Sequence, residues 1–429
     1  MRTLNIRPLL AAASILALTA CGLEGTDSQE QETVQTSSDT SNDYGYQTYS
    51  DDNLADSMAS NDEAANNTAT RSGESVSGDA SNMGADNAIP DSEERPTMQL
   101  QVVLDRQGFG PGVVDGKMGM STRHALSGFQ EANDLEVTGE HDEATKEALA
   151  QYDGIAATRV VTIPDDWGDL EFTDMPESTA DKAEMERLGY TSLDEKLAER
   201  LHTTVAVLKE LNPGGKPAGM ESDAGDGAGE DASADGEDAS SGEGSADTSK
   251  SFFAAGQQIR VPNVGADRIE PGAIQDRGWQ MTLASLGVGT EQPQVDRIVV
   301  SKEGQTLKAY EGEKLVAIFT VSSGSSEFPL PLGEWDIVGE AYNPPYSYDP
   351  EVLGNDDPDG KTYTLPPGPN GPVGIVWIDL SKEHYGIHGT PEPETIGRAQ
   401  SSGCVRLTNW GAARLAQMVD TETQVIFEA

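Results

Sequence analysis

One cysteine and one histidine near the C-terminus have the types and spacing for nucleophilic chemistry. Cys404 follows His388 by sixteen positions (404 − 388), in a chain that has only two cysteines and five histidines. A thiol becomes a nucleophile when it loses its proton, and a neighbouring imidazole can accept that proton. Ser401, Ser402 and Gly403 precede Cys404; these small residues leave the sulfur accessible, and backbone N–H groups there could bind an oxyanion. The pair therefore predicts covalent catalysis by a cysteine.

Two further residues lie close to this pair in the sequence. Arg406 adds a positive charge that can hold a substrate carboxylate, in bidentate fashion where the geometry permits. His384 is the only other histidine in the same segment, and we expect it to be a structural or rim residue. The remaining histidines, at positions 124, 141 and 202, fall in other segments of the chain.

Several short apolar runs must form the scaffold that positions the cysteine and the histidine. Runs rich in β-branched and aromatic residues follow one another from Val295, separated by Gly, Pro, Asp and Asn, and they predict a mainly-β sandwich or barrel. The sequence Glu311-Gly312-Glu313 predicts a hairpin loop, and a helix is expected from Asn409 to Val419. The stretch 342–372 is crowded with Pro, Tyr, Asp and Gly, and loops of this length are often lids or binding loops.

These motifs resemble the catalytic domain of L,D-transpeptidases of the YkuD type. That family carries His-Gly-Thr on one strand and, after a loop, Ser-(often His)-Gly-Cys-(Ile/Val)-Arg. Here the two motifs are residues 388–390 and 401–406, and the similarity extends back to Val295 through the stretch SSGSSEFPLPLGEWDI. The resemblance covers about a third of the chain, residues 295–429, and its paired motif is specific.

The resemblance implies a role for each motif residue. Cys404 would be the acyl-enzyme nucleophile, His388 its base, and the backbone carbonyl of Gly389 the group that orients the imidazole. Ser402 stands where many family members have His, which leaves open any supporting hydrogen bond from that position. The expected substrate-binding residues are Arg406, Ser401, Ser402, Gly403 and Thr390.

The implied reaction is attack on the amide between the L-centre and the D-centre of a tetrapeptide stem, with loss of D-alanine and formation of a 3-3 peptidoglycan cross-link. No metal or organic cofactor is required, and a carbapenem would trap the thiol as a thioester. Two alternatives keep the same acyl-enzyme: water as acceptor gives an L,D-carboxypeptidase or endopeptidase, and a protein lysine gives a protein-to-peptidoglycan ligase. A third alternative is a non-catalytic lipoprotein that anchors the wall, although the presence of both Cys404 and His388 argues against it.

The segment 97–151 predicts a small three-helix unit, because apolar residues at helical spacing are separated by Gly-rich turns. Two turns of like chemistry, residues 114–116 and 137–139, are each followed by a threonine that can open a helix, Thr122 and Thr145. This pattern, with its Gln-bearing helix ALSGFQ, resembles a peptidoglycan-binding domain, which implies binding to wall glycan. A structural helical unit without a ligand is the alternative.

The middle segment, residues 185–263, predicts two helices joined at residues 202–204 and ending at Asn212-Pro213, then a short strand in FFAAGQQIRVPNV. Without its acidic insertion, 214–250, it is similar to a LysM module. The usual opening strand is not evident before Leu193. We expect His202 to end a helix rather than to bind a ligand, because no second His or Cys lies nearby at metal-ligand spacing.

The N-terminus has the pattern of an export signal. Arg2 and Arg7 precede the apolar run 9–20, which is too short to span a bilayer. The following Leu-Thr-Ala-Cys-Gly resembles a bacterial lipobox, so residues 1–20 would be a signal peptide and Cys21 a lipidated first residue; an ordinary secretory signal is the alternative. The protein is expected to be periplasmic and anchored in the outer membrane, with Cys404 as its single free thiol.

The charge of the chain is strongly negative and unevenly distributed. Lys and Arg total 28 against 74 Asp and Glu, a net charge of −46, which argues against nucleic acid as a partner. Residues 23–97 carry 17 acidic and 2 basic residues, and residues 214–250 carry 10 and 2. Both stretches are rich in Gly, Ser, Ala and Asn and nearly free of large apolar side chains, so we expect a disordered tether over 21–96 and a disordered insertion over 214–250. The remaining acidity fits either a high-salt habitat or an ordinary acidic exported protein.

Overall fold

The computed structural model describes residues 89–429 except 221–250, 266–273, 351–359, 400 and 402. The expected signal peptide, the lipidated Cys21, nearly all of the tether, most of the acidic insertion and Ser402 lie outside the described residues. Within the part of the chain that is described, no helix is both long and apolar enough to cross a membrane.

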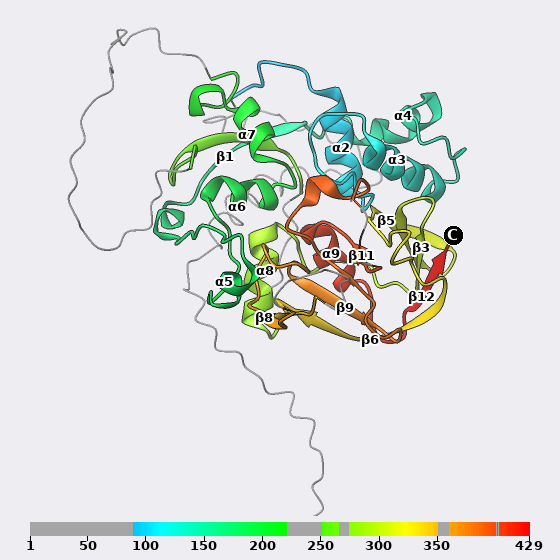
Figure 1. Ribbon diagram of the computed structural model, residues 1–429. Helices are drawn as coiled ribbons and strands as arrows, with labels where there is room; N and C mark the ends of the chain where they lie inside the picture. The colour runs from blue at the N-terminus through cyan, green and yellow to red at the C-terminus, as the bar shows by residue number, and fades with distance from the viewer. Residues whose placement is uncertain (1–88, 221–250, 266–273, 351–359, 400, 402) are drawn as a thin grey trace, which may run out of the picture. The chain divides into compact units, whose positions relative to one another are not determined.

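The C-terminal region is a mainly-β domain built on one eight-stranded sheet (Figure 1). The strand order is β11-β10-β9-β6-β12-β3-β4-β5; β12 pairs with β3 and β10 with β11 in parallel, and the other neighbours are antiparallel. The strands of this sheet are β3 (Arg297–Ser301), β4 (Thr306–Glu311), β5 (Lys314–Thr320), β6 (Gly333–Tyr342), β9 (Val376–Leu380), β10 (Gly386–His388), β11 (Val405–Arg406) and β12 (Gln424–Glu428). A small separate pair, β7 (Tyr346–Tyr348) and β8 (Tyr363–Leu365), occupies the long stretch between β6 and β9.

Buried and less buried residues alternate along these strands, as is typical of strands that place one face in the core. In β9, for example, Val376, Ile378 and Leu380 are buried while the residues between them are less covered. The expected hairpin at 311–313 is present, with Gly312 at a φ of +61°, a conformation that glycine adopts without strain. The mainly-β class and the C-terminal helix are therefore confirmed, and all the strands of this domain except β7 and β8 form one curled sheet.

Two helices cover the buried face of this sheet. Helix α9 (Asn409–Ala416) lies against β9 and β10, and its N-cap Thr408 accepts a hydrogen bond from the N–H of Gly411. Helix α8 (Arg277–Leu286) packs on α9 and was not predicted from the sequence. Its Trp279, Leu283 and Leu286 belong to the same hydrophobic core as the strands, so this core begins upstream of Val295.

The helical N-terminal region contains α2 (Pro96–Arg106), α3 (Met120–Ala132) and α4 (Glu143–Leu149), as expected, followed by the short 3-10 helix η1 (Ala150–Tyr152). Its core also contains Ile318 of β5, and a Cβ on Gly128 of α3 would lie 2.5 Å from the Ile318 side chain. The backbone N–H of Gly110 donates to the Ile318 carbonyl at 2.9 Å. The helical region thus covers β5, the strand at one edge of the sheet. This cover prevents β5 from pairing with strands of other chains.

A buried glutamine holds each of the two similar turns noticed in the sequence. The Oε1 of Gln101 accepts from the N–H groups of Asp115 and Gly116 at 3.1 and 2.7 Å, and its Nε2 donates to Thr122 Oγ1 at 3.1 Å. Gln130 repeats the arrangement with the turn at 137–139 and with the hydroxyl of Thr145. The two threonines therefore lie inside their helices as glutamine partners rather than at the caps; the N-cap of α4 is Asp142.

The middle segment begins earlier than the predicted residue 185: it extends back to Thr158 and is a strand-helix-helix-strand unit. Helices α6 (Leu193–Arg200) and α7 (Val205–Leu211) and strand β2 (Gln258–Pro262) are where the sequence predicts them. An opening strand that sequence reasoning missed, β1 (Thr158–Thr162), pairs with β2 in antiparallel register across the long insertion. Shorter helical turns in this region are η2 (Asp165–Asp169), α5 (Thr179–Ala183) and η3 (Pro213–Gly215), and η5 (Pro393–Thr395) follows β10.

A buried ionic cluster joins the three regions. Asp105 of α2 accepts from Arg414 of α9 at 2.9 Å, and His202 Nδ1 lies 3.2 Å from the other Asp105 oxygen. His202 Nε2 lies 3.1 Å from the Leu286 carbonyl, and the imidazole stacks on Trp410 at 5.0 Å. Arg414 and His202 hold the pKa of Asp105 well below its usual range despite burial. His202 does end a helix as expected, but it is fully buried and connects the segments.

Candidate active site

Two neighbouring strands place Cys404 and His388 on one face of the sheet. In the parallel pair β10 and β11, Ile387 pairs with Val405 and His388 with Arg406, so Cys404 stands beside Gly386 at the start of the pair. Residues two apart on a strand point to the same face. The thiol, the imidazole and the Arg406 guanidinium therefore share one face at the edge of the sheet.

The imidazole of His388 is buried and held in one tautomer. Its Nδ1 donates to the carbonyl of Gly389 at 2.7 Å, so Nε2 carries the lone pair. The ring stacks on Trp377, with centroids 5.5 Å apart and an interplanar angle of 21°. Burial, assisted by the charge of Arg406, lowers the pKa of His388 to about 3, against the hydrogen bond to Gly389. His388 is therefore a neutral imidazole, and no hydrogen bond is recorded for its Nε2 within the described residues.

The thiol of Cys404 is half-buried and uncharged. Its Sγ lies 3.7 Å from the backbone carbonyl of His384, to which it donates. Burial raises the pKa of Cys404, although the N–H of Gly386 and the charge of Arg406 act in the opposite direction. Among the described contacts, the thiol hydrogen bond goes to this carbonyl and not to His388. The site thus holds a thiol and a neutral imidazole rather than a thiolate and an imidazolium.

The turn before Cys404 is fixed by its own residues. Gly403 has a φ of +108°, and a Cβ there would lie 2.6 Å from the ring of Tyr385, so only glycine fits. Ser401 donates from its hydroxyl to the Cys404 carbonyl at 2.5 Å and accepts from the N–H of Gly403 at 3.2 Å. The Gly403 N–H is therefore occupied within the turn, and the Ser401 hydroxyl shapes the loop that presents the sulfur.

The remaining substrate-binding candidates differ in their surroundings. Arg406 has a buried Nε without a hydrogen-bond partner among the described residues, and its charge acts on both Cys404 and His388. It is thus the group best placed to receive a substrate carboxylate. Thr390 is buried, and its hydroxyl accepts from the N–H of Glu392 at 3.3 Å, which is a local turn.

Sequence reasoning missed two tyrosines at this site. Burial raises the pKa of Tyr346 of β7, which lies close enough to Cys404 and Arg406 for electrostatic interaction with both groups. The ring of Tyr385 packs against Gly403. No local motif marks either residue; the only sequence signal was the Tyr-rich stretch after β6.

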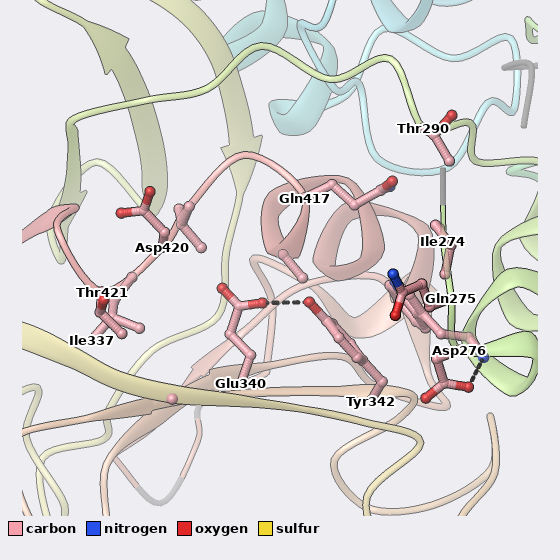
Figure 2. Close-up of a pocket in the computed structure, with 14 residues that line it drawn as sticks. Ile274, Gln275, Asp276, Thr290, Ile337, Glu340, Tyr342, Gln417, Asp420 and Thr421 are labelled. Carbon is pink, nitrogen blue, oxygen red and sulfur yellow. Dashed lines mark hydrogen bonds between the residues drawn. The ribbon is translucent and has the colours of Figure 1, made fainter. Parts of the chain in front are cut away.

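A cavity of about 650 Å³ lies on the other face of the sheet. Figure 2 shows Glu340 and Tyr342 of β6 pointing toward each other there, joined by a hydrogen bond of 2.7 Å. Tyr342 pairs with Val376, whereas His388 pairs with the next residue, Trp377, and successive strand residues face opposite sides. This cavity is therefore separate from the thiol and imidazole. Within the described residues, no group of three or more His, Cys, Asp or Glu side chains is arranged to hold a metal ion.

Comparison with known proteins agrees with both expected domains. Residues 295–427 match the "L,D-transpeptidase catalytic domain" family, YkuD, and residues 95–149 match the "Putative peptidoglycan binding domain" family. The chain is 46% identical over 128 residues to the "Putative L,D-transpeptidase YkuD" of Bacillus subtilis and 36% identical over 129 residues to its namesake in Bacillus licheniformis. Each match covers 30% of this chain and 63% of the relative. A solved L,D-transpeptidase from Mycobacterium smegmatis is similar at 21% identity and a TM-score of 0.26, over 31% of this chain and 58% of that one.

The C-terminal region therefore matches the catalytic domain of the L,D-transpeptidase class. More particularly, the chain contains a YkuD-type catalytic domain joined to an N-terminal peptidoglycan-binding domain. Because the chain spans less than two thirds of the length of the two Bacillus relatives, the activity of the whole protein is a proposal.

Proposed function

We propose that the protein is an L,D-transpeptidase that forms 3-3 cross-links in peptidoglycan through a Cys404 acyl-enzyme. The observation that carries this proposal is the neutral His388, whose Nδ1 is committed to the Gly389 carbonyl at 2.7 Å and whose Nε2 is free to accept a proton on the face that bears the thiol. A base arranged in this way accepts the thiol proton while the sulfur attacks the substrate. It does not keep the cysteine deprotonated before the substrate binds.

The proposed reaction has two steps. As the Cys404 sulfur attacks the amide carbonyl between the L-centre and the D-centre, His388 takes the thiol proton; the C–S bond forms, the C–N bond breaks, and D-alanine leaves with that proton. A side-chain amine of a second stem then attacks the thioester; the new C–N bond forms, the C–S bond breaks, and the amine proton returns to the thiol through His388. Arg406 binds a carboxylate of the donor stem.

The helical and middle regions bring this chemistry to the wall. The domain at 95–149 belongs to a peptidoglycan-binding family, so we infer that it binds the substrate polymer. The strand-helix-helix-strand order of the middle segment, with β1 supplying the opening strand absent from the sequence prediction, supports a LysM-like module that binds glycan. Its Asn212 ties α7 to β2, since Nδ2 donates to the Arg260 carbonyl at 2.7 Å.

A lipid anchor on Cys21 would hold the enzyme at the periplasmic face of the outer membrane, as the sequence from Leu18 to Gly22 predicts. Replacement of Cys21 by Ser is expected to abolish diacylglycerol labelling and to move the protein to the soluble fraction. Continued membrane fractionation of that variant would count against the anchor.

The proposed activity is tested by incubating purified sacculi with the full chain, digesting them and weighing the muropeptides. New 3-3 dimers are expected with the wild type and not with Cys404→Ala. Shortened tripeptide stems without dimers would instead identify water as the acceptor, and muropeptides attached to protein lysine would identify a ligase. Unchanged muropeptides with the wild type would contradict the enzymatic proposal.

A further inference from the structure

The side chain of Asn409 supports the backbone that holds the catalytic imidazole. Asn409 is the first residue of α9 and has no exposed surface. Its Oδ1 lies directly against Gly389 and Gly374, so a Cβ added to either glycine would overlap with that oxygen. Gly389 supplies the carbonyl that accepts from His388 Nδ1. The position of the Asn409 amide therefore limits where this carbonyl can lie.

A residue of the middle segment fixes that amide. The Nδ2 of Asn409 donates to Glu199 Oε1 at 2.7 Å and to the Pro369 carbonyl at 3.2 Å. Glu199 lies near the end of α6 and is only 8% exposed. A hydrogen bond to a carboxyl group in such a buried place is stronger than one in water, and losing it leaves the donor with a single partner.

We propose that Glu199 is a positioning residue for His388 and that it acts through the Asn409 amide. The fixed amide supports the Gly389 backbone, and the Gly389 carbonyl keeps the proton of His388 on Nδ1, which leaves Nε2 free to act as the base. The proposal rests on the proposed function of the site. It assigns to the middle segment a part in catalysis in addition to its inferred binding of the wall.

The same segment contacts the catalytic domain at a second place, which supplies a control. Asn370, in the loop after β8, donates from Nδ2 to Glu195 Oε1 at 2.9 Å. Its backbone N–H also donates to the Leu188 carbonyl at 3.0 Å. Glu195 thus joins the two regions without touching Asn409. Loss of this contact weakens the docking of the segment and leaves the support of His388 in place.

The test compares two uncharged replacements in the full chain. Glu199→Met keeps the volume and removes the acceptor, whereas Glu199→Gln keeps a carbonyl oxygen for the Asn409 amide; Glu195→Met is the docking control. Burial raises the pKa of Glu199 to about 7, so a neutral side chain at this position is compatible with the fold. The readouts are the kcat and KM of acylation by a tetrapeptide stem and the ¹⁵N spectrum of histidine-labelled protein, with the His388 signals assigned by their loss in His388→Gln.

In Glu199→Met we expect kcat to fall by about 10- to 100-fold with little change in KM, because small misplacements of a catalytic group have effects of this size. The His388 signals should lose the single Nδ1–H tautomer. Glu199→Gln and Glu195→Met should keep both the tautomer and kcat within about two-fold of the wild type.

Wild-type kcat and an unchanged His388 spectrum in Glu199→Met would overturn the positioning role. Equal losses of kcat in all three variants would also overturn it. Such losses would mean that activity depends on contact between the middle segment and the catalytic domain, and not on the acceptor that Glu199 offers to Asn409. If Glu199→Met lost its native thermal transition, Asn409→Ala would be compared with Glu195→Met by the same two measurements. A wild type that is not acylated, but that shows the predicted spectra, would contradict the proposed function alone.

Discussion

At the scale of residues, the distinctive feature is that the proposed nucleophile and the proposed base are both uncharged. Burial lowers the pKa of His388 to about 3 and raises that of Cys404, so neither group ionises near neutral pH. Burial of the imidazole and the Arg406 charge both disfavour an imidazolium. In the proposed mechanism, proton transfer is therefore coupled to attack on the substrate, and a protonated thiol would be less open to general oxidation between turnovers.

The neutral imidazole and the protonated thiol predict an unusual pH dependence of the acylation and alkylation rates. Because the imidazole stays neutral down to about pH 3, kcat/KM for acylation should show no acid limb near the ordinary histidine pKa and should hold to about pH 4 while the protein stays folded. Alkylation of Cys404 by iodoacetamide should rise with pH and reach half its maximum above the usual thiol pKa. Stopped-flow acylation and alkylation rates over this pH range provide the check. An acid limb at pH 6 to 7 would mean that the imidazole is exposed and ordinary.

Arg406 gives a second prediction at this scale. Arg406→Ala should reduce kcat/KM for stem peptides by the equivalent of about 1.5 to 3 kcal/mol, the usual value of a hydrogen bond to a charged group. Arg406→Lys should recover only part of the loss, because an ammonium cannot bind a carboxylate through two parallel N–H groups. Alkylation by a small uncharged reagent at high pH serves as the control and should persist in both variants. A wild-type kcat/KM in Arg406→Ala would remove Arg406 from the substrate site.

At the scale of elements, the glutamine that holds each turn of the helical domain makes a specific prediction. Gln130→Ala leaves the part-buried N–H of Thr138 and the buried N–H of Gly139 without their acceptor, at a cost of about 1 to 3 kcal/mol for the buried group. Thermal unfolding should show the loss, and binding to sacculi should weaken with it. Gln151→Ala is the matched control, since that side chain is exposed and, among the described residues, donates to the nearby Ala148 carbonyl. Equal stability of the two variants would show that the turn does not depend on Gln130.

The elements also show what a sequence can and cannot predict. Strong local patterns were sufficient for β3, β4, β5, β6 and β9, for α6 and α7, and for the cysteine and histidine motifs, because strand alternation and helical spacing can be recognised within a few residues. Strand β12, near the centre of the sheet, was not predicted. Strand β1 was missed because its partner lies about a hundred positions away, beyond the insertion. The contact between Glu199 and Asn409 spans 210 positions, and no sequence motif near either residue indicates it. Pairings of this kind depend on tertiary packing alone.

At the scale of the whole molecule, the described regions share buried contacts instead of meeting only through linkers. Ile318 of the sheet completes the core of the helical domain, and Asp105 binds both Arg414 and His202. A charge buried with hydrogen-bonded partners contributes little net stability, yet removing one partner leaves the others uncompensated. We therefore expect the three regions to unfold together.

Asp105→Ala tests this expectation. The variant should lose about 3 to 5 kcal/mol of unfolding free energy, because Arg414 and His202 would remain buried without their carboxylate. Calorimetry should show a single transition in the wild type, shifted to lower temperature in the variant. Arg123→Ala, which breaks the exposed pair with Glu140, should change stability by less than about 1 kcal/mol. Two separate wild-type transitions, or equal effects of the two variants, would contradict a shared core.

The most direct test of the account is the covalent state of Cys404. Intact-protein mass spectrometry after incubation with a carbapenem should show one adduct on the wild type, formed when the thiol opens the lactam ring to a thioester. We expect no adduct on Cys404→Ala and slow formation on His388→Ala, and the double variant should be no worse than Cys404→Ala, because the two groups act as a unit. An adduct that persists on Cys404→Ala, or an undiminished rate in His388→Ala, would mean that this cysteine and histidine share a sheet face without sharing a mechanism.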